Sequence, residues 1–388
     1  MPIKGIINLP GDKSISHRAL MVASLTSGKT YINNLSTGMD VESTKSCLRA
    51  CGIQISKIKS TIVVTPEKFK SPGIPLDCGN SGTTARLLTG LLVGRKLNAQ
   101  LIGDKSLSKR PMNRIIEPLN KMGACIQSNN GHLPLIISSS NIDAIDYTMP
   151  VASAQVKSSI IFASLGSDGQ TVIREKIKTR DHTEIMLKYL GVGISNGKSI
   201  CINPIKNKLT PFEITIPGDP SSAAFYAAAA AMIPNSDLTI KNLLANPTRI
   251  CFFSILEKMG TKISWSNMRN EMGELVGDVH IYSQPLNGLN ISDETIPLII
   301  DEIPIIAVLA TQADSPTIIK GAQELRVKES DRINSICHNL KKMGADIIET
   351  NDGFIINPEN KLTHAKINTF GDHRIAMAFT IAGLMKNK

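Results

Sequence analysis

A short motif, Leu-x-x-x-Gly-x-x-Ile, constrains the fold of this chain more than any other feature of its sequence. It occurs five times, at steps of 71, 68, 69 and 84 residues between its glycines, which are Gly52, Gly123, Gly191, Gly260 and Gly344. A leucine four residues before such a glycine is typical of a last helical turn that a left-handed glycine ends. The isoleucine three residues later then begins a strand. Five copies at a nearly constant step predict a chain built from one repeated α/β unit.

A second series of polar residues marks another helix start in each unit. Asp, Asn or Ser stands just before an apolar stretch, which is the chemistry of a helix N-cap. The six positions are Asp12, Asn80, Ser153, Asp219, Asp301 and Asp372. Alternating runs at 61–65 and 135–138 predict strands between the helices. We therefore expect six helices of a first kind, five of a second kind, and units of strand–helix–strand–helix with one or two further strands.

The two series differ by one member. The repeat step puts a sixth Leu-x-x-x-Gly at about residues 414 to 428, beyond Lys388. We therefore expect the chain to stop before its last repeated helix.

Length and composition limit the class of protein. The 388 residues predict two domains of about 200 residues each, and a hydrophobic content of 42% supports a sizeable core. The sequence has no run of about 18 apolar residues that predicts a membrane span, and its start resembles neither a signal nor a transit peptide. The seven cysteines include no Cys-x-x-Cys pair, which favours structural thiols over a metal site. We expect a cytoplasmic protein without a metal.

The net charge of +10 fits either a nucleic-acid partner or small anionic substrates. Basic residues are spread thinly and aromatic residues make up only 4%, so the sequence has no stacking platform for bases. Helix N-termini bind anions through their free N–H groups, and several here carry cations. Their positions favour small anions over nucleic acid.

The first two helix starts have the residues of an anion site. Lys13 and Ser14, with Arg18 one turn later, can hold a phosphate or carboxylate. The alternative is a solvated first turn. Residues 80–84 form a compact polar turn in which Gly82 lets a substrate approach the backbone, or simply a capped loop.

Two later segments place cations beside helix starts. Arg110 stands before Pro111, which suits the first turn of a helix. Arg180 precedes Asp181, a good cap, and His182, which is more often a surface group or one that acts through a neighbour.

The densest cluster of charges is at residues 326–332. Lys328 and Arg332 share a helical face and Glu329 lies beside them, although such runs are normally solvated. A carboxyl group between two cations titrates low unless it is buried. Asp301 precedes a strongly apolar helix, where an ionised acid can serve as a base or as a plain N-cap. His373 and Arg374 add a further imidazole and cation, at the last repeated helix start.

Taken together, these segments resemble the 5-enolpyruvylshikimate-3-phosphate synthase family of enolpyruvyl transferases. The matching segments keep the family's order and are residues 9–18, 77–86, 109–112, 153–155, 180–184, 217–222, 246–249, 326–332 and 371–374. The resemblance implies an inside-out, barrel-like α/β fold of two domains with three repeated units each. One domain comprises residues 1–12 and 219–388, the other 13–218, and the active site lies in the cleft between them.

The resemblance also implies the reaction. The enolpyruvyl group of phosphoenolpyruvate passes to the 5-hydroxyl of shikimate 3-phosphate by addition and elimination, which releases phosphate in the shikimate pathway. It implies no cofactor, and we expect a monomer without nucleic-acid or membrane partners. Family members extend some tens of residues further at the C-terminus, and many have a second serine where this chain has Ala154.

Residue roles follow from the same resemblance. The residues implied for shikimate 3-phosphate are Lys13, Ser14, Arg18, Ser153, Gln155, Arg180, Asp301 and Lys328. Those implied for phosphoenolpyruvate are Lys13, Asn80, Gly82, Arg110, Gln155, Arg332, His373 and Arg374. The implied catalytic groups are Asp301, Glu329, Lys13 and His373. Gly82 also implies sensitivity to glyphosate-like inhibitors.

Two alternatives remain at this stage. The sister family transfers enolpyruvate to UDP-N-acetylglucosamine, but it usually carries a reactive cysteine in a loop where residues 103–110 have none. A non-catalytic, truncated relative that binds anions or a partner protein is the other.

Overall fold

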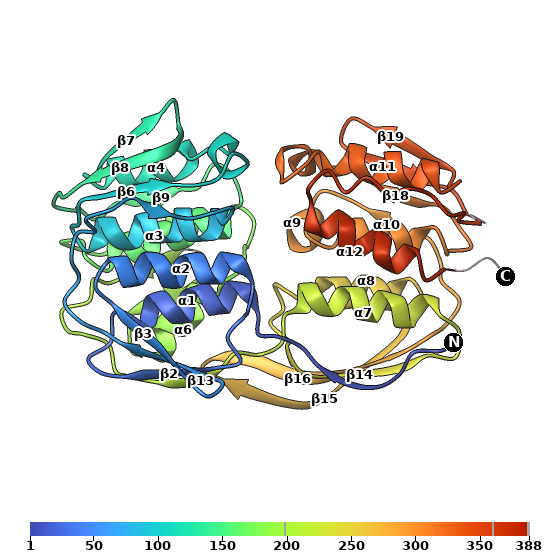
Figure 1. Cartoon of the computed structure of the whole chain (residues 1–388), viewed down its shortest axis with the longest axis horizontal. Coiled ribbons are helices and arrows are strands. Elements are labelled where there is room, and N and C mark those ends of the chain that lie inside the picture. The colour runs from blue at the N-terminus through green and yellow to red at the C-terminus, as the bar shows by residue number, and fades with distance from the viewer. Residues whose placement is uncertain (198, 359–360, 386–388) are drawn as a thin grey trace. The chain divides into compact units, whose positions relative to one another are not determined.

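The computed structural model describes residues 1–197, 199–358 and 361–385 (Figure 1). The chain forms two compact units. Unit 1 comprises residues 1–9, 218–269 and 275 onward, and unit 2 comprises residues 10–217 and 270–274. No helix among the described residues is long and apolar enough to cross a membrane.

Unit 2 contains six α-helices in its described part and three four-stranded sheets. Its helices are α1 (Lys13–Ala23), α2 (Met39–Ala50), α3 (Gly82–Gly94), α4 (Asn113–Lys121), α5 (Ala154–Ser164) and α6 (His182–Tyr189). Its strands are β2 (Thr30–Asn33), β3 (Gln54–Ile58), β4 (Thr61–Thr65), β5 (Leu76–Asp77), β6 (Ala99–Ile102), β7 (Cys125–Asn129), β8 (His132–Ser138), β9 (Asp146–Thr148), β10 (Thr171–Arg174), β11 (Ile194–Asn196), β12 (Ile200–Ile202) and β13 (Glu213–Thr215). The sheet orders are β13-β2-β4-β3, β5-β6-β8-β7 and β9-β10-β12-β11.

Unit 1 has two four-stranded sheets in its described part. Its helices are α7 (Pro220–Met232), α8 (Cys251–Lys258), the short α9 (Ile296–Ile299), α10 (Ile303–Ala310), α11 (Arg332–Lys342) and α12 (His373–Ala382). Its strands are β1 (Lys4–Asn8), β14 (Asp237–Leu244), β15 (Lys262–Glu271), β16 (Glu274–Tyr282), β17 (Asn290–Ile291), β18 (Thr317–Ile319), β19 (Ile347–Thr350) and β20 (Gly353–Ile356). The sheet orders are β1-β14-β16-β15 and β17-β18-β20-β19, and the described strands close no barrel.

The repeated unit is confirmed. In every sheet the first strand runs parallel to the second, and a hairpin then adds two antiparallel strands. Helices of the first kind are α1, α3, α5, α7, α10 and α12, and those of the second kind are α2, α4, α6, α8 and α11. The five repeat glycines follow the second-kind helices with φ between 83° and 104°.

The helix starts agree with the expected caps at most positions. Asp12, Ser153, Asp219 and Asp372 accept hydrogen bonds from backbone N–H groups of their helices. In the second unit the cap is Ser81, next to Asn80.

Two further expectations about helix starts were wrong, and a third was confirmed in position only. Asp301 is no N-cap, because Glu302 occupies that position of α10 without a side-chain bond. Pro111 lies outside the first turn of α4, since this helix begins at Asn113. Asp181 stands at the N-cap position of α6 but makes no capping side-chain bond.

Two strands exchange places between the units. β1 precedes α1 in sequence but pairs in parallel with β14, which follows α7. β13 precedes α7 but pairs in parallel with β2, which follows α1. Each unit therefore completes one sheet with a strand from a distant part of the chain.

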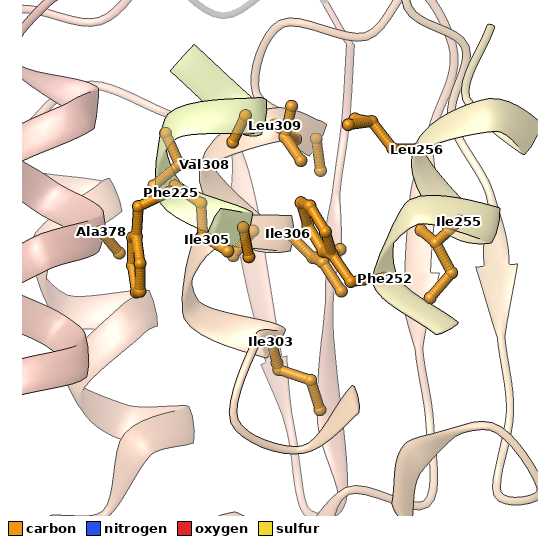
Figure 2. Close-up of a cluster of buried hydrophobic side chains, with 14 of the residues drawn as sticks. Phe225, Phe252, Ile255, Leu256, Ile303, Ile305, Ile306, Val308, Leu309 and Ala378 are labelled. Atoms are coloured by element: carbon orange, nitrogen blue, oxygen red, sulfur yellow. The ribbon is translucent and has the colours of Figure 1, made fainter. Parts of the chain in front are cut away.

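The first-kind helices form the centre of each unit. In unit 2, α3 packs against α5. The approach is so close that a Cβ on Gly90 would overlap the carbonyl of Ser159, and one on Gly94 would lie 2.7 Å from that of Phe162. In unit 1, α7, α10 and α12 pack on one another, and Figure 2 shows Phe225 and Ile306 among their apolar side chains. Burying these helices brings their polar N-termini together within each unit.

Candidate functional site

The candidate residues lie at helix starts in two clusters, one in each unit. The unit 2 cluster contains Lys13, Ser14, Arg18, Asn80, Gly82, Arg110, Ser153, Gln155 and Arg180. The unit 1 cluster contains Asp301, Lys328, Glu329, Arg332, His373 and Arg374.

Lys13 opens α1 and faces an acid from the next helix. Its Nζ lies 2.9 Å from Asp40 Oδ2, and the Lys13 side chain keeps 35% of its surface exposed. The start of α1 is fixed beneath it, because buried Asp12 accepts from the Ile15 N–H at 2.7 Å. The ammonium group is thus oriented while still accessible to an anion.

Arg18 is buried one turn further along α1. Its Nε donates to Thr183 Oγ1 and its Nη2 to Ser158 Oγ, both at 2.7 Å, while Nη1 donates to the Ser14 carbonyl. The guanidinium therefore ties α1 to α5 and α6.

Two guanidinium groups frame Gly82 at the start of α3. A Cβ on Gly82 would lie 3.0 Å from Arg86 Nη1 and 3.5 Å from Arg110 Nη1. Arg110 donates to Asn80 Oδ1 at 2.5 Å, and Arg86 donates to Gln155 Oε1 at the same distance. Gly82 thus leaves space beside two fixed cations, which suits an anion.

Ser153 and Arg180 lie at the starts of α5 and α6. Ser153 Oγ accepts from the Val156 N–H at 3.4 Å. Arg180 is partly exposed and precedes Asp181, whose carboxylate pairs with Lys178 at 3.1 Å.

Arg332 is the centre of the unit 1 cluster and is almost fully buried. Its nitrogens lie 2.7 Å from Glu329 Oε2, 2.8 Å from Asp372 Oδ2 and 3.6 Å from Asp301 Oδ1. Burial lowers the pKa of Arg332, but the nearby carboxylates, with Glu329 the largest contributor, raise it above the ordinary value. Burial raises the pKa of Asp372, yet the Arg332 guanidinium holds it below the usual range.

Lys328 lies beside the same acids. Burial lowers its pKa below the ordinary value, although the charges of Asp301 and Glu324 act in the opposite direction. Its Nζ lies 4.0 Å from Glu324 Oε1. A lysine with a lowered pKa can give up or share a proton more readily than an exposed one.

His373 and Arg374 begin α12. His373 is exposed, whereas Arg374 is buried and donates to the Ser221 carbonyl at 3.4 Å. The Arg374 guanidinium carbon lies 6.0 Å from the centroid of the Phe225 ring, within cation–π range.

Sequence reasoning missed several partners of these residues. It assigned no role to Arg86 or Asp40. It also overlooked a buried polar group, in which Ser221 donates to Glu302 at 2.5 Å. In the same group, Arg249 pairs with Asp219 at 3.1 Å. Most of these residues stand inside or next to the matching segments, so their charge at a helix start was the available signal.

Comparisons with known proteins agree on one family. The family model described as EPSP synthase (3-phosphoshikimate 1-carboxyvinyltransferase) matches residues 1–388. The 3-phosphoshikimate 1-carboxyvinyltransferase of Thermoanaerobacter sp. (strain X514) is 46% identical over 389 residues, covering 99% of this chain and 91% of that protein. The enzyme of the same name from Geobacillus kaustophilus (strain HTA426) is 45% identical, covering 98% of this chain and 91% of that protein.

Solved structures give the same result. The 2.37 Å structure of EPSP synthase from Acinetobacter baumannii has a TM-score of 0.88 and 39% identity, and the match covers 99% of this chain and 90% of that one. The family model, the relatives and the fold together show that this chain belongs to the EPSP synthase (3-phosphoshikimate 1-carboxyvinyltransferase) family.

Proposed function

We propose that this chain transfers the enolpyruvyl group of phosphoenolpyruvate to the 5-hydroxyl of shikimate 3-phosphate, and so serves aromatic amino acid biosynthesis. The observation that carries the proposal is the pairing of fixed cations with acids at helix starts. Arg332 holds Glu329 and Asp301 within 4 Å in unit 1, and Arg86 and Arg110 frame Gly82 in unit 2. Both substrates are anionic, and the reaction needs acids and bases beside them.

Both clusters contribute residues to substrate binding. Ser14 and Arg18 take the carboxylate of shikimate 3-phosphate, Ser153 and Arg180 take its phosphate, and Gln155 lies against its ring. The residues proposed for phosphoenolpyruvate are Lys13, Asn80, Gly82, Arg110, Gln155, Arg332, His373 and Arg374. We also propose that residues 1–12 with 219–388 form one domain and residues 13–218 the other.

The chemistry is proposed to be an addition followed by an elimination. Asp301 removes the proton of the 5-hydroxyl, which Lys328 orients, as the oxygen bonds to C2 of phosphoenolpyruvate. Glu329 delivers a proton to the methylene carbon, with Lys13 assisting and His373 adjacent. The tetrahedral adduct then loses phosphate and a methyl proton, which restores the double bond. Fixed cations favour this heavily anionic adduct over the separate substrates.

The remaining parts of the proposal concern the state of the protein. We propose a cytoplasmic monomer that requires no metal or organic cofactor and has no nucleic-acid or membrane partner. Gel filtration with light scattering, and turnover in the presence of a chelator, test these points. A dimer, or activity lost to the chelator, would contradict them.

The function is tested by phosphate release. Phosphoenolpyruvate is mixed with the chain and either shikimate 3-phosphate or UDP-N-acetylglucosamine. We expect release with shikimate 3-phosphate alone. Release with the UDP-sugar alone would overturn the proposal, and no release with either would favour a non-catalytic anion-binding protein.

A further inference from the structure

A long hairpin ends in a tight turn that belongs to unit 2. Strands β15 and β16 are joined by Met272 and Gly273, whose φ values of 49° and 86° are typical of a two-residue type I′ turn. The Gly273 N–H donates to Asn270 Oδ1 at 2.8 Å. Residues 270–274 are part of unit 2, although the rest of both strands belongs to unit 1.

The hairpin tip packs on the start of α6. Glu274 Oε1 lies 2.7 Å from His182 Nδ1, and both side chains are buried. Gly273 fits against the same helix, since a Cβ there would lie 2.8 Å from Ile185 Cγ2. A carboxylate only accepts, so Nδ1 of the imidazole donates. A buried carboxylate needs such a partner because leaving it without one is costly.

The first turn of α6 connects this contact to the unit 2 cluster. Thr183, next to His182, accepts from Arg18 Nε at 2.7 Å and is hydrogen-bonded to Ser158 at the same distance. Glu184 pairs with buried Lys157 at 2.8 Å. Arg180 lies two residues before His182 in the chain. A shift of this turn would therefore move the anchor of Arg18 and the backbone that carries Arg180.

We infer that Glu274 is a positioning residue for the shikimate 3-phosphate site. Through His182 it holds the first turn of α6, and through that turn it sets the places of Arg180 and Arg18. The inference rests on the proposed function, which assigns these two arginines to the phosphate and carboxylate of that substrate. It adds a residue more than 90 positions away in sequence, at the start of β16 and next to the hairpin turn.

Steady-state kinetics with both substrates varied test the inference. Glu274→Ala removes the acceptor, and we expect the KM for shikimate 3-phosphate to rise at least about tenfold, because misplacing a binding group by about 1 Å costs up to ~10²-fold. The KM for phosphoenolpyruvate is expected to stay within about twofold. Glu274→Gln keeps an acceptor oxygen for the imidazole and should restore the KM to within about threefold of the original. Glu257→Ala, the same change on the exposed face of α8, is the matched control and should change neither KM.

A double-mutant cycle shows whether the two residues act as one. If Glu274 works through His182, Glu274→Ala combined with His182→Ala raises the KM for shikimate 3-phosphate no further than the larger single effect. Independent, multiplying effects would contradict the inference.

The outcomes separate this inference from the proposed function. If the chain without any substitution does not turn over shikimate 3-phosphate, the proposed function is wrong. An active chain whose Glu274→Ala variant has a lower Tm but an unchanged KM for shikimate 3-phosphate overturns the inference, because the contact would then be structural only. If Glu274→Ala does not fold, Glu274→Asp keeps the charge and shortens the side chain. We then expect a KM at least about threefold higher, and no change would equally overturn the inference.

Discussion

At the scale of single residues, the cations of both clusters are held by acceptors that fix their direction. Arg332 lies among the carboxylates of Glu329 and Asp372, and Arg18 is held by hydroxyl groups of Thr183 and Ser158. Side chains fixed in this way lose little rotamer freedom when an anion binds. They also need no reorganisation as charge develops during a reaction.

Lys13→Met tests the role of the cation on α1. We expect turnover to fall by more than about 10³-fold, because Lys13 is proposed to contact both substrates and the adduct. The fold should remain, since the pair with Asp40 is about one-third exposed and such pairs contribute about 0–1 kcal/mol. The kcat and the Tm are measured beside Lys57→Met on exposed β3. A folded Lys13→Met variant with ordinary kcat would refute the assigned role.

Gly82→Ala tests the space between the two guanidinium groups. The new methyl would lie 3.0 Å from Arg86 Nη1 and 3.5 Å from Arg110 Nη1, so one of them must move. Overpacking of this kind costs about 1–3 kcal/mol, which corresponds to roughly a 5- to 150-fold loss of affinity.

The measurements are the glyphosate concentration that halves the activity and the KM for phosphoenolpyruvate. Both values are expected to rise in Gly82→Ala, whereas Gly169→Ala, whose Cβ meets only Ala144 at ordinary distance, should match the original chain. If glyphosate inhibited Gly82→Ala as strongly as it inhibits the original chain, this space would not be part of the site.

His17 makes stability depend on pH. Burial, followed by the charges of Lys13 and Arg18, lowers the pKa of His17 from 6.5 to about 3, while Asp40 opposes the shift. As the pH falls, His17 of the unfolded chain binds a proton near pH 6.5, whereas His17 of the folded chain binds it only near pH 3. The stabilisation is therefore complete above pH 6.5 and is lost as the pH falls, at up to about 1.4 kcal/mol per pH unit.

His17→Asn keeps a hydrogen-bonding partner for Thr44 but does not titrate. Its free energy of unfolding, from urea titrations between pH 4.5 and 7, is expected to fall less steeply on acidification than that of the original chain. Parallel curves would show that His17 does not set this dependence.

The sequence predicted single residues only where the signal was local. A cation or a cap at a helix start could be read from the chain, and Lys13, Asp12 and Arg374 all lie at such starts. The partners of such residues could not be predicted, because Asp40 is 27 residues from Lys13 and Asp372 is 40 residues from Arg332. Such pairs depend on which helices pack together.

At the scale of elements, the repeat predicted which helices and strands each unit contains, but it did not predict how closely these elements pack. The second-kind helices end at the expected glycines, and β4 covers residues 61–65 as expected. The packing of α3 on α5 had no such signal, because Gly90 and Gly94 read only as weak helix formers. The structure gives them a role, since the backbone of α5 occupies the space where their side chains would be.

Gly90→Ala tests this packing. Alanine favours a helix over glycine by about 1 kcal/mol, but its methyl would overlap the Ser159 carbonyl, which cannot rotate away. We expect a net loss of about 1–3 kcal/mol in the free energy of unfolding, measured by urea titration. Gly73→Ala, whose Cβ meets open space, is the control. A Gly90→Ala variant as stable as the control would show that the two helices separate at little cost.

At the scale of the whole molecule, the chain passes between its units more than once. The first unit change, between residues 9 and 10, leaves β1 paired with β14, and the return between residues 217 and 218 leaves β13 paired with β2. A second excursion carries residues 270–274 into unit 2. The repeat could not predict the exchanged strands, because each pairing joins residues about 180 to 230 positions apart and periodicity reports only local order.

The exchange of β1 predicts that its loss harms the unit that lies mostly at the other end of the chain. Removing residues 1–8 takes away five residue pairs between β1 and β14, with hydrogen bonds worth about 0.5–1.5 kcal/mol each. We expect faster amide hydrogen exchange in residues 237–241 and in the α7–α10–α12 core. Helices α3 and α5 should keep their protection, because β1 belongs to none of the sheets of unit 2.

Removing only residues 1–2, which precede β1, is the matched control and should leave all peptides unchanged. Equal loss of protection in α3 and α5 would mean that the two units unfold as one cooperative body. No loss in residues 237–241 would mean that β14 is held by β16 alone, through the antiparallel pairing on its other side. Either result would contradict the prediction that β1 stabilises unit 1 selectively, although in sequence it leads directly into the first helix of unit 2.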